Sequence, residues 1–220
     1  MNLYKILLTG LAATVIATAP TYAQFDLSSQ RKEVQNYLKV PGHKVDHKGI
    51  IINPTPHKIT VDSSKTVSFR NGFSAKARLM QELGSDFTTL QIPTSDRGLK
   101  LSAEYGEKVA AKAGVKNVKG AYSLNINKNG VSIKAFDRSG VFYALQTLRQ
   151  LIDSPVSKDS SLPFVSINDY PDLPYRGVVE GFYGNPWSHE VRLSLIDFYG
   201  RNKMTDYIYG PKDDPYHSSP

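Results

Sequence analysis

Two short apolar segments separated by a helical pattern, near the carboxyl end, constrain the fold of this chain most strongly. Residues 175–180 and 205–209 are predicted strands, and residues 188–200 repeat apolar side chains at helical spacing. This order predicts a β-α-β unit, the building block of a parallel sheet or barrel. The helix has an apolar face that needs a sheet of more than two strands to cover it, formed by Val191, Leu195, Phe198 and Tyr199.

The sequence after residue 209 offers no third strand of this kind. A (β/α)8 barrel repeats the β-α unit eight times over ~250 residues, so one β-α-β unit is only its start. We therefore expect residues 171–220 to be the beginning of an incomplete (β/α)8 TIM barrel. The chain is then either a fragment of a longer gene product or a truncated product, and the sequence leaves both open.

Residues 50–170 carry a different pattern, made of short strands and helices. β-Rich segments are expected at residues 50–56, 58–61 and 66–69, the last two separated by a turn at residues 62–64. These strands are too short to form a core by themselves, so they predict a small sheet that helices must cover.

The next stretch predicts a helix and then a strand. Apolar residues recur at helical spacing over residues 74–83, and Gly84 is expected to end that helix. A strand is expected at residues 88–92. Residues 103–116 fit either a strand or a helix.

A hairpin signal is the clearest local feature of the chain. Residues 121–126 and 131–135 both alternate between apolar and polar side chains, and Asn-Gly in the connecting residues 127–130 tolerates the positive φ of a tight turn. Asp137 then leads into a predicted helix over residues 141–151 with one apolar face.

Together these elements predict an α+β domain in which helices cover one face of a small, mostly antiparallel sheet. Ser154-Pro155 and Leu162-Pro163 are expected to mark a linker to the carboxyl-terminal part. The predicted organisation is a domain over residues 50–170, an extended lead-in over residues 24–49, and a signal peptide over residues 1–23.

The signal peptide rests on the first residues of the chain. Lys5 precedes an uncharged stretch at residues 6–19, and Thr21 and Ala23 supply small residues for a cleavage site. The stretch is shorter than the ~20 residues of a membrane span, so no membrane insertion is expected after cleavage. The chain has no cysteine, which excludes disulfides and thiolate metal sites. An exported protein, periplasmic or extracellular, fits this composition.

The net charge of +7 comes from lysines and arginines scattered along the sequence. No block of like charges and no basic stretch with interleaved aromatic residues is present, whereas a nucleic-acid surface needs clustering as well as excess charge. The pattern indicates a solvated surface and no nucleic-acid partner.

Glycine, aromatic and charged residues gather where each predicted parallel strand ends, at residues 180–187 and 209–217. In α/β barrels this end is the functional face. Glycines let the backbone approach a ligand closely, Tyr183 and Trp187 can form apolar walls for a sugar ring, and Lys212 offers donors to hydroxyl groups. The mixture favours a carbohydrate ligand.

The same residues carry a resemblance to a known family. The runs DYP (169–171), YRGVVEGFYGNPW (175–187), NKM (202–204) and YIYGPKDD (207–214) resemble the opening of the catalytic barrel of glycoside hydrolase family 84. The upstream segments YSL (122–124) and GVFYALQTL (140–148) resemble the small α+β domain that precedes the barrel in families 84 and 20.

Family 20 is the close competitor, because it shares this domain and an Arg-Gly at the first barrel strand. Family 20 enzymes continue toward an Asp and a second Arg, whereas this sequence continues from Arg176-Gly177 with VVEGFYG. For Arg176 we therefore expect a structural pairing at the start of the strand in place of the sugar-binding role of its family 20 counterpart.

The resemblance implies a β-N-acetylglucosaminidase that acts on terminal β-linked N-acetylglucosamine of a glycan or glycoconjugate. In family 84 the 2-acetamido oxygen of the substrate attacks the anomeric carbon, which gives an oxazoline intermediate and overall retention. The Asp pair that assists this attack lies on a later strand and is absent from these 220 residues. The chain alone is therefore expected to be inactive.

Two sugar-contacting positions carry over from the resemblance, Gly181 through its backbone and Lys212 through its ammonium group. Tyr183 is expected to form a wall of the pocket. Asp213-Asp214 is an adjacent carboxylate pair in the second-strand loop, where charge balance for Lys212 is favoured over catalysis. No cofactor is implied.

Glu180 could be an acid/base, but a hydrogen-bonded, inward-facing carboxylate is favoured. Trp187 could cap the first helix or contact substrate. His189 and His217 have no partners at metal-ligand spacing, and no metal site is expected. A hypothesis of another class remains, in which the chain is a carbohydrate-associated accessory module or an inactive truncation product.

Overall fold

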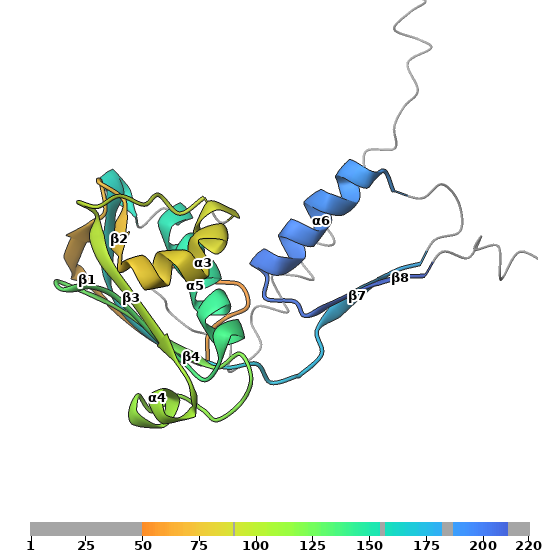
Figure 1. Cartoon of the computed structure of the whole chain (residues 1–220), viewed down its shortest axis with the longest axis horizontal. Coiled ribbons are helices and arrows are strands. Elements are labelled where there is room, and N and C mark those ends of the chain that lie inside the picture. The colour runs from red at the N-terminus through yellow and green to blue at the C-terminus, as the bar shows by residue number, and fades with distance from the viewer. Residues whose placement is uncertain (1–49, 90, 155–156, 182–186, 211–220) are drawn as a thin grey trace, which may run out of the picture. The chain divides into compact units, whose positions relative to one another are not determined.

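The computed structural model describes residues 50–89, 91–154, 157–181 and 187–210 (Figure 1). Within these ranges the chain is an α+β structure with a mixed six-stranded sheet, a separate pair of parallel strands and four α-helices. The predicted signal peptide and lead-in lie outside the described residues. None of the helices in the described part of the chain is long and apolar enough to cross a membrane.

The six-stranded sheet has the strand order β1-β6-β4-β5-β3-β2. The pairs β1·β6, β6·β4 and β4·β5 are antiparallel, while β5·β3 and β3·β2 are parallel. The predicted mostly antiparallel sheet is therefore a mixed one. The strands are β1 (Lys58–Ser68), β2 (Phe73–Ala75), β3 (Leu99–Tyr105), β4 (Tyr122–Asn127), β5 (Gly130–Ala135) and β6 (Ser161–Asp169).

Two helices, α3 (Ala77–Thr89) and α5 (Arg138–Asp153), lie on the same side of this sheet (Figure 1). They bury the side chains that alternate inward from the strands, which form one continuous apolar core. A short helix, α4 (Glu107–Lys112), belongs to a second, smaller apolar cluster. Fully buried core side chains include Leu124, Ile133, Leu145, Leu148 and Ile167.

The predicted hairpin is confirmed as β4 and β5, which pair antiparallel. Gly130, at the start of β5, has φ +119°, and a Cβ at this position would lie 2.1 Å from the carbonyl oxygen of Lys100. The helix expected over residues 141–151 is α5, and it begins earlier because Asp137 Oδ1 accepts the Gly140 N–H at 2.8 Å as its N-cap.

Residues 58–68 form one strand where two were predicted, at residues 58–61 and 66–69. The expected turn at residues 62–64 is an irregularity inside β1, where the register against β6 shifts between Asp62 and Thr66. The predicted strand at residues 50–56 is wrong as well. That segment pairs with no strand. Its apolar residues Ile50 and Ile52 pack into the core instead.

Helix α3 does not stop at Gly84, because the helix continues to Thr89. Leu83 and Phe87, one turn apart, are both buried, so tertiary packing on the sheet outweighs the low helix propensity of one glycine. The strand predicted at residues 88–92 is therefore wrong. The undecided segment over residues 103–116 contains both possibilities, the end of β3 followed by α4.

Leu162-Pro163 is not a linker, because both residues belong to β6. This strand pairs with β1 on one side and with β4 on the other. Pro163 lies opposite Thr66, at the point where the β1 register shifts. Proline is tolerated within a sheet at such an irregularity, since no regular ladder hydrogen bond is lost there.

The predicted strand-helix-strand order is present as β7 (Gly177–Glu180), α6 (His189–Arg201) and β8 (Asp206–Tyr209). The two strands pair in parallel, with Gly177 opposite Asp206. A Cβ on Gly177 would lie 2.6 Å from the Asp206 carbonyl oxygen, so this close pairing requires glycine. Ser188 caps α6 by accepting the Val191 N–H.

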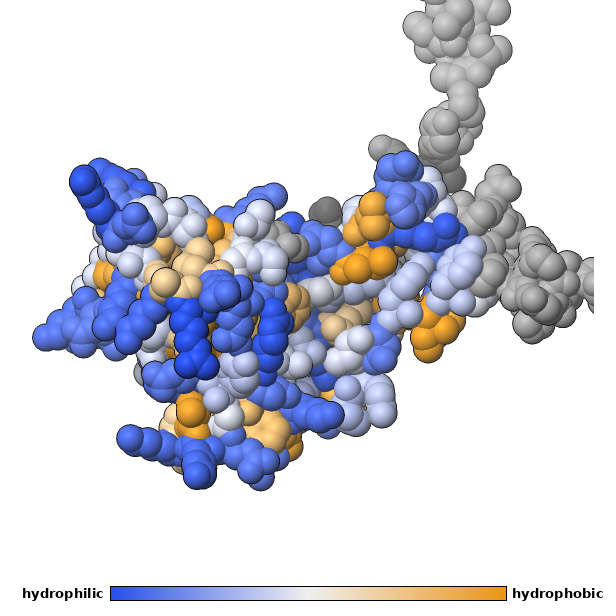
Figure 2. Space-filling view, viewed as in Figure 1, coloured by the Kyte–Doolittle hydropathy of each residue, from blue (hydrophilic) through white to orange (hydrophobic). Residues whose placement is uncertain are grey.

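The β7-α6-β8 unit exposes large apolar side chains. Val179 is 64% exposed, Leu193 55% and Ile208 56%. Figure 2 shows apolar side chains gathered over this part of the molecule. A parallel pair of strands is normally covered on both faces, and in the described residues this pair is not.

Candidate functional site

The carboxyl ends of β7 and β8 meet at one edge. Glu180 and Tyr209 are register partners, and the Gly210 N–H donates to the Glu180 carbonyl at 3.1 Å. Gly181 follows β7 directly, is exposed, and has no atom within 4 Å of the position that a Cβ would take. Among the described residues, no atom occupies the space beside its Cα. Tyr183 and Lys212, the other predicted sugar-contacting residues, lie outside the described residues, as do Asp213, Asp214 and His217.

Glu180 is buried at this edge and fully engaged. Arg192 Nε donates to Oε1 and Oε2 at 3.1 and 3.0 Å, and Arg192 Nη2 donates to Oε1 at 2.9 Å. The Tyr207 hydroxyl donates to Oε2. These contacts, with the Arg192 hydrogen bonds first, lower the pKa of Glu180. Glu180 is thus an ionised acceptor, and the prediction of a hydrogen-bonded structural carboxylate is confirmed.

Arg192 joins the three elements of the unit. Its guanidinium lies 4.6 Å from the centroid of the Tyr209 ring while it pairs with Glu180. The Tyr199 and Tyr207 rings stack at 6.1 Å. The ion pair between α6 and β7, and the ring contacts between α6 and β8, hold the ligand-facing edge together.

Trp187 and His189 lie at the start of α6. Trp187 is 44% exposed, and its backbone contributes a hydrogen bond to the Glu180 carboxylate. This backbone contact ties the helix start to β7 and leaves the indole ring partly available. His189 is exposed. Across the described ranges, no group of three or more His, Cys, Asp or Glu side chains could hold a metal ion.

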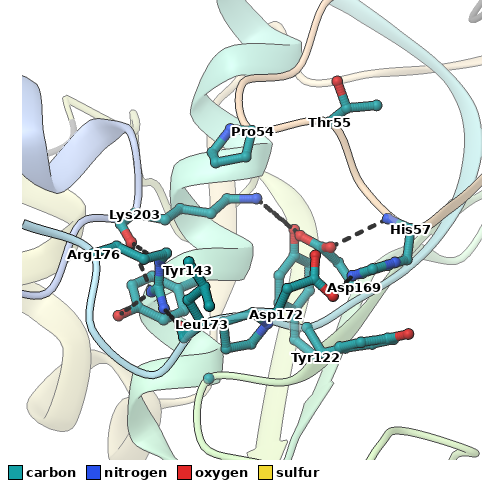
Figure 3. Close-up of a pocket in the computed structure, with 13 residues that line it drawn as sticks. Pro54, Thr55, His57, Tyr122, Tyr143, Asp169, Asp172, Leu173, Arg176 and Lys203 are labelled. Carbon is teal, nitrogen blue, oxygen red and sulfur yellow. Dashed lines mark hydrogen bonds and ion pairs between the residues drawn. The ribbon is translucent and has the colours of Figure 1, made fainter. Parts of the chain in front are cut away.

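A second polar cluster lies between the six-stranded sheet and the β7-α6-β8 unit, beside a cavity of about 220 Å³ (Figure 3). Lys203 Nζ donates to the Tyr122 hydroxyl at 2.9 Å and to Asp169 Oδ2 at 3.1 Å. The Tyr122 hydroxyl is 3.0 Å from Asp169 Oδ2 and 2.6 Å from Thr147 Oγ1. The His57 N–H donates to Asp169 Oδ1 at 3.3 Å.

Burial dominates the electrostatics of this cluster. Lys203 is 5% exposed and Tyr122 1%. Loss of hydration lowers the pKa of Lys203, against the attraction of Asp169. Burial first, and then the Asp169 charge, raises the pKa of Tyr122 well above its usual value. A neutral phenol can therefore donate to Asp169 while it accepts from Lys203.

Arg176 precedes β7 and binds backbone carbonyls. Its Nε and Nη2 donate to the Lys203 carbonyl at 3.1 and 2.8 Å, and Nη1 donates to the Leu173 carbonyl at 2.5 Å. Nη2 also lies 3.2 Å from the Tyr143 hydroxyl. The structural pairing expected for Arg176 at the start of the strand is confirmed.

No sequence signal indicates the roles of Lys203 and Asp169. They belong to the runs NKM and DYP, which resemble family 84 but imply no partner for either residue. A lysine between a helix and an apolar strand, such as Lys203, is usually a surface residue, so its position did not indicate burial. The partners are 34 residues apart, so the spacing along the chain did not suggest the pairing.

Both the α+β domain and the β-α-β unit match family models, and these models place the chain in the β-N-acetylglucosaminidase class of families 20 and 84. The family model described as "Glycosyl hydrolase family 20, domain 2" matches residues 16–170, and the chain belongs to this family. Residues 176–220 match a second family model, described as "beta-N-acetylglucosaminidase".

Similar proteins carry names from the same class. The chain is 41% identical over 85 residues to the N,N'-diacetylchitobiase of Vibrio harveyi, which covers 39% of this chain and 9% of that protein. It is 29% identical over 185 residues to a beta-hexosaminidase of Vibrio vulnificus, covering 82% of this chain and 20% of that protein. Among solved structures, CpGH84B is 31% identical with a TM-score of 0.57, over 76% of this chain and 31% of its own.

The chain thus spans a tenth to a fifth of the length of these curated relatives, and under a third of the solved structure.

Proposed function

We propose that this chain belongs to an exported glycoside hydrolase that removes terminal β-linked N-acetylglucosamine from a glycan or glycoconjugate. The observation that carries the proposal is the edge where β7 and β8 end. There Gly181 is open to a ligand next to Gly210, in a segment that matches the beta-N-acetylglucosaminidase family model. Carboxyl ends of parallel strands are where α/β enzymes bind their ligands.

The mechanism proposed is substrate-assisted and retaining. The acetamido oxygen of the substrate attacks the anomeric carbon, the leaving-group oxygen is protonated, and water then opens the oxazoline with net retention. The Asp pair required for these proton transfers is not in this chain. Glu180 is ionised and held by Arg192, so it has no proton to give at neutral pH. The 220-residue chain by itself is therefore proposed to be inactive.

The roles proposed for the chain's own residues are limited to binding. Gly181 contacts the sugar through its backbone, Lys212 donates to ring hydroxyls through its ammonium group, and Tyr183 forms a wall of the pocket. The partial exposure of the Trp187 indole supports a further apolar contact at the same edge.

The β7-α6-β8 unit is proposed to be the start of a (β/α)8 barrel within residues 171–220, preceded by the α+β domain over residues 50–170. The support is the exposure of Val179 and Ile208 on a parallel pair of strands, which further strands and helices would cover. We also propose that residues 1–23 direct export to the periplasm or beyond.

Assignment to family 84 is the finer proposal. The similarity to CpGH84B and the VVEGFYG run after Arg176 support it. A family 20 β-hexosaminidase is the second candidate, because the family 20 domain model covers residues 16–170. An Asp-Asp pair after an apolar strand in the continuation of the reading frame favours family 84, and its absence there favours family 20.

Lys212→Ala tests the proposed binding role in the full-length protein. Loss of a charged hydrogen-bond donor costs about 1.5–3 kcal/mol, so kcat/KM on a chromogenic β-N-acetylglucosaminide should fall about 10- to 100-fold. Lys128→Ala, in the hairpin turn, is the matched control and should leave kcat/KM within about twofold. Equal activity of the two variants would show that Lys212 does not bind the sugar.

A further inference from the structure

Lys203 follows α6 in a backbone conformation that lysine rarely adopts. Its φ is 60°, in the left-handed region, where glycine is the usual residue at a helix end. The Lys203 N–H donates to the Gly200 carbonyl, and the Met204 N–H to the Tyr199 carbonyl, both at 3.0 Å. Lysine is strained in this conformation, whereas glycine adopts it freely. The contacts of its side chain therefore explain why lysine occupies this position.

The side chain of Lys203 reaches out of its own unit and into the α+β domain. Its ammonium group binds Asp169 at the end of β6 and the Tyr122 hydroxyl at the start of β4 (Figure 3). Tyr122 is held in turn by Thr147 on α5. Removal of one partner from a buried ion pair leaves the other charge without compensation, which makes such a contact hard to break.

The backbone of Lys203 connects to the starts of both parallel strands. Its carbonyl accepts two hydrogen bonds from Arg176, the residue before β7. The Arg176 carbonyl accepts the Thr205 N–H at 2.7 Å, and the Thr205 hydroxyl accepts the Arg176 N–H at 2.8 Å. Thr205 precedes β8. One residue thus links the amino ends of β7 and β8 to the α+β domain.

We propose that Lys203 and Asp169 are positioning residues through which the α+β domain fixes β7 and β8, and with them the ligand-binding edge at Gly181 and Gly210. This rests on the function proposed above. Each strand has four residues, about 13 Å, so a shift at the amino end carries through to the carboxyl end. The task of the α+β domain is then to hold the edge at Gly181 and Gly210 in place.

Hydrogen exchange on this chain tests the anchoring without any need for activity. The double variant Asp169→Asn/Lys203→Met removes both charges of the ion pair. No unpaired charge is then buried, so the variant is expected to fold. We expect amides of β7 and β8 to exchange at least tenfold faster, while amides of helix α3, which carries no residue of the Lys203 cluster, keep their rates. Lys128→Met is the control and should change neither. Unchanged exchange in β8, or an equal increase in α3, would overturn the proposal.

Kinetics of the full-length protein test the positioning step. The double variant should raise KM for a chromogenic β-N-acetylglucosaminide about tenfold at a temperature where it remains folded, because loops displaced by even ~1 Å bind and orient substrate poorly. An unchanged KM would contradict the positioning role. A wild-type protein without turnover would instead contradict the proposed function, while the exchange result would still stand.

Discussion

The hydroxyl of Tyr122 is the group through which the buried cluster is most directly tested. It accepts from Lys203, lies 2.6 Å from Thr147 Oγ1 and donates to Asp169, in a side chain that is 1% exposed. Tyr122→Phe leaves Thr147 without this partner and removes one contact from each charge. We expect the free energy of unfolding in urea to fall by about 1–3 kcal/mol with an unchanged m-value.

Tyr105→Phe is the matched control. This tyrosine also donates a hydrogen bond to a carboxylate, that of Glu82, but it is 44% exposed. Because water can replace the hydroxyl as a partner of the exposed Glu82 carboxylate, the free energy of unfolding should fall by less than about 0.5 kcal/mol. Equal losses in the two variants would mean that burial does not strengthen the Tyr122 contacts.

The carboxylate of Asp62, at the irregularity in β1, should make the stability of the fold depend on pH. Ser64 Oγ donates to its carboxylate at 2.5 Å and Lys65 Nζ at 2.9 Å, and these contacts lower the pKa of Asp62 from 3.8 to about 2. Because the ionised form favours the folded state, this stabilisation is present above pH 3.8 and is lost as the pH falls toward 2. Ser64→Ala should move the pKa back toward 3.8 in an NMR titration of the carboxyl carbon.

Ser63→Ala is the control for that titration, since Ser63 is exposed and next to the same carboxylate in sequence. It should leave the pKa of Asp62 at about 2. A pKa that stays low in Ser64→Ala would assign the shift to Lys65 instead.

At the scale of elements, Gly84 distinguishes the predicted helix end from the observed helix interior. It lies inside α3, and a Cβ there would meet no atom within 4 Å. Gly84→Ala should therefore raise the free energy of unfolding by about 0.4–1 kcal/mol, because alanine restricts the unfolded chain at no steric cost. Thermal denaturation measures this as an increased Tm.

Gly130→Ala is the opposite case and the natural comparison. Its φ of +119° and the 2.1 Å approach to the Lys100 carbonyl oxygen leave no room for a methyl group. We expect Gly130→Ala to lower the free energy of unfolding by more than about 1 kcal/mol. A decreased Tm for Gly84→Ala would imply that the helix does end at that residue.

Elements with local signals were predictable and those with distant partners were not. The β4-β5 hairpin has its turn residues and both strands within 14 positions, and the structure confirms it. Strand β6 begins with residues that resemble a linker, and it is a strand because β1 and β4 pair with its two sides. Helix α3 passes Gly84 because Phe87 packs in the core.

The candidate site divides in the same way. The proposed role of Gly181 comes from the family resemblance, and the structural role of Arg176 was predicted from the VVEGFYG run that follows it. The hydrogen bonding of Glu180 was predicted from the cost of burying an unpaired charge. The Lys203–Asp169 pair did not follow, because it depends on how two regions of the chain pack together.

At the scale of the whole molecule, the described residues form two connected parts that differ in burial. The α+β domain has an apolar core, whereas the β7-α6-β8 unit exposes Val179, Leu193 and Ile208. The chain's place in a β-N-acetylglucosaminidase is the claim on which the roles of Gly181 and Lys203 depend.

One measurement tests that claim most directly. The purified full-length protein is incubated with an aryl β-N-acetylglucosaminide, and the released sugar is followed by proton NMR before its anomers equilibrate. We expect hydrolysis in which the β-anomer of N-acetylglucosamine appears first, because substrate-assisted catalysis retains configuration. We also expect no turnover by the 220-residue chain. Absence of hydrolysis by the full-length protein, or initial release of the α-anomer, would contradict it.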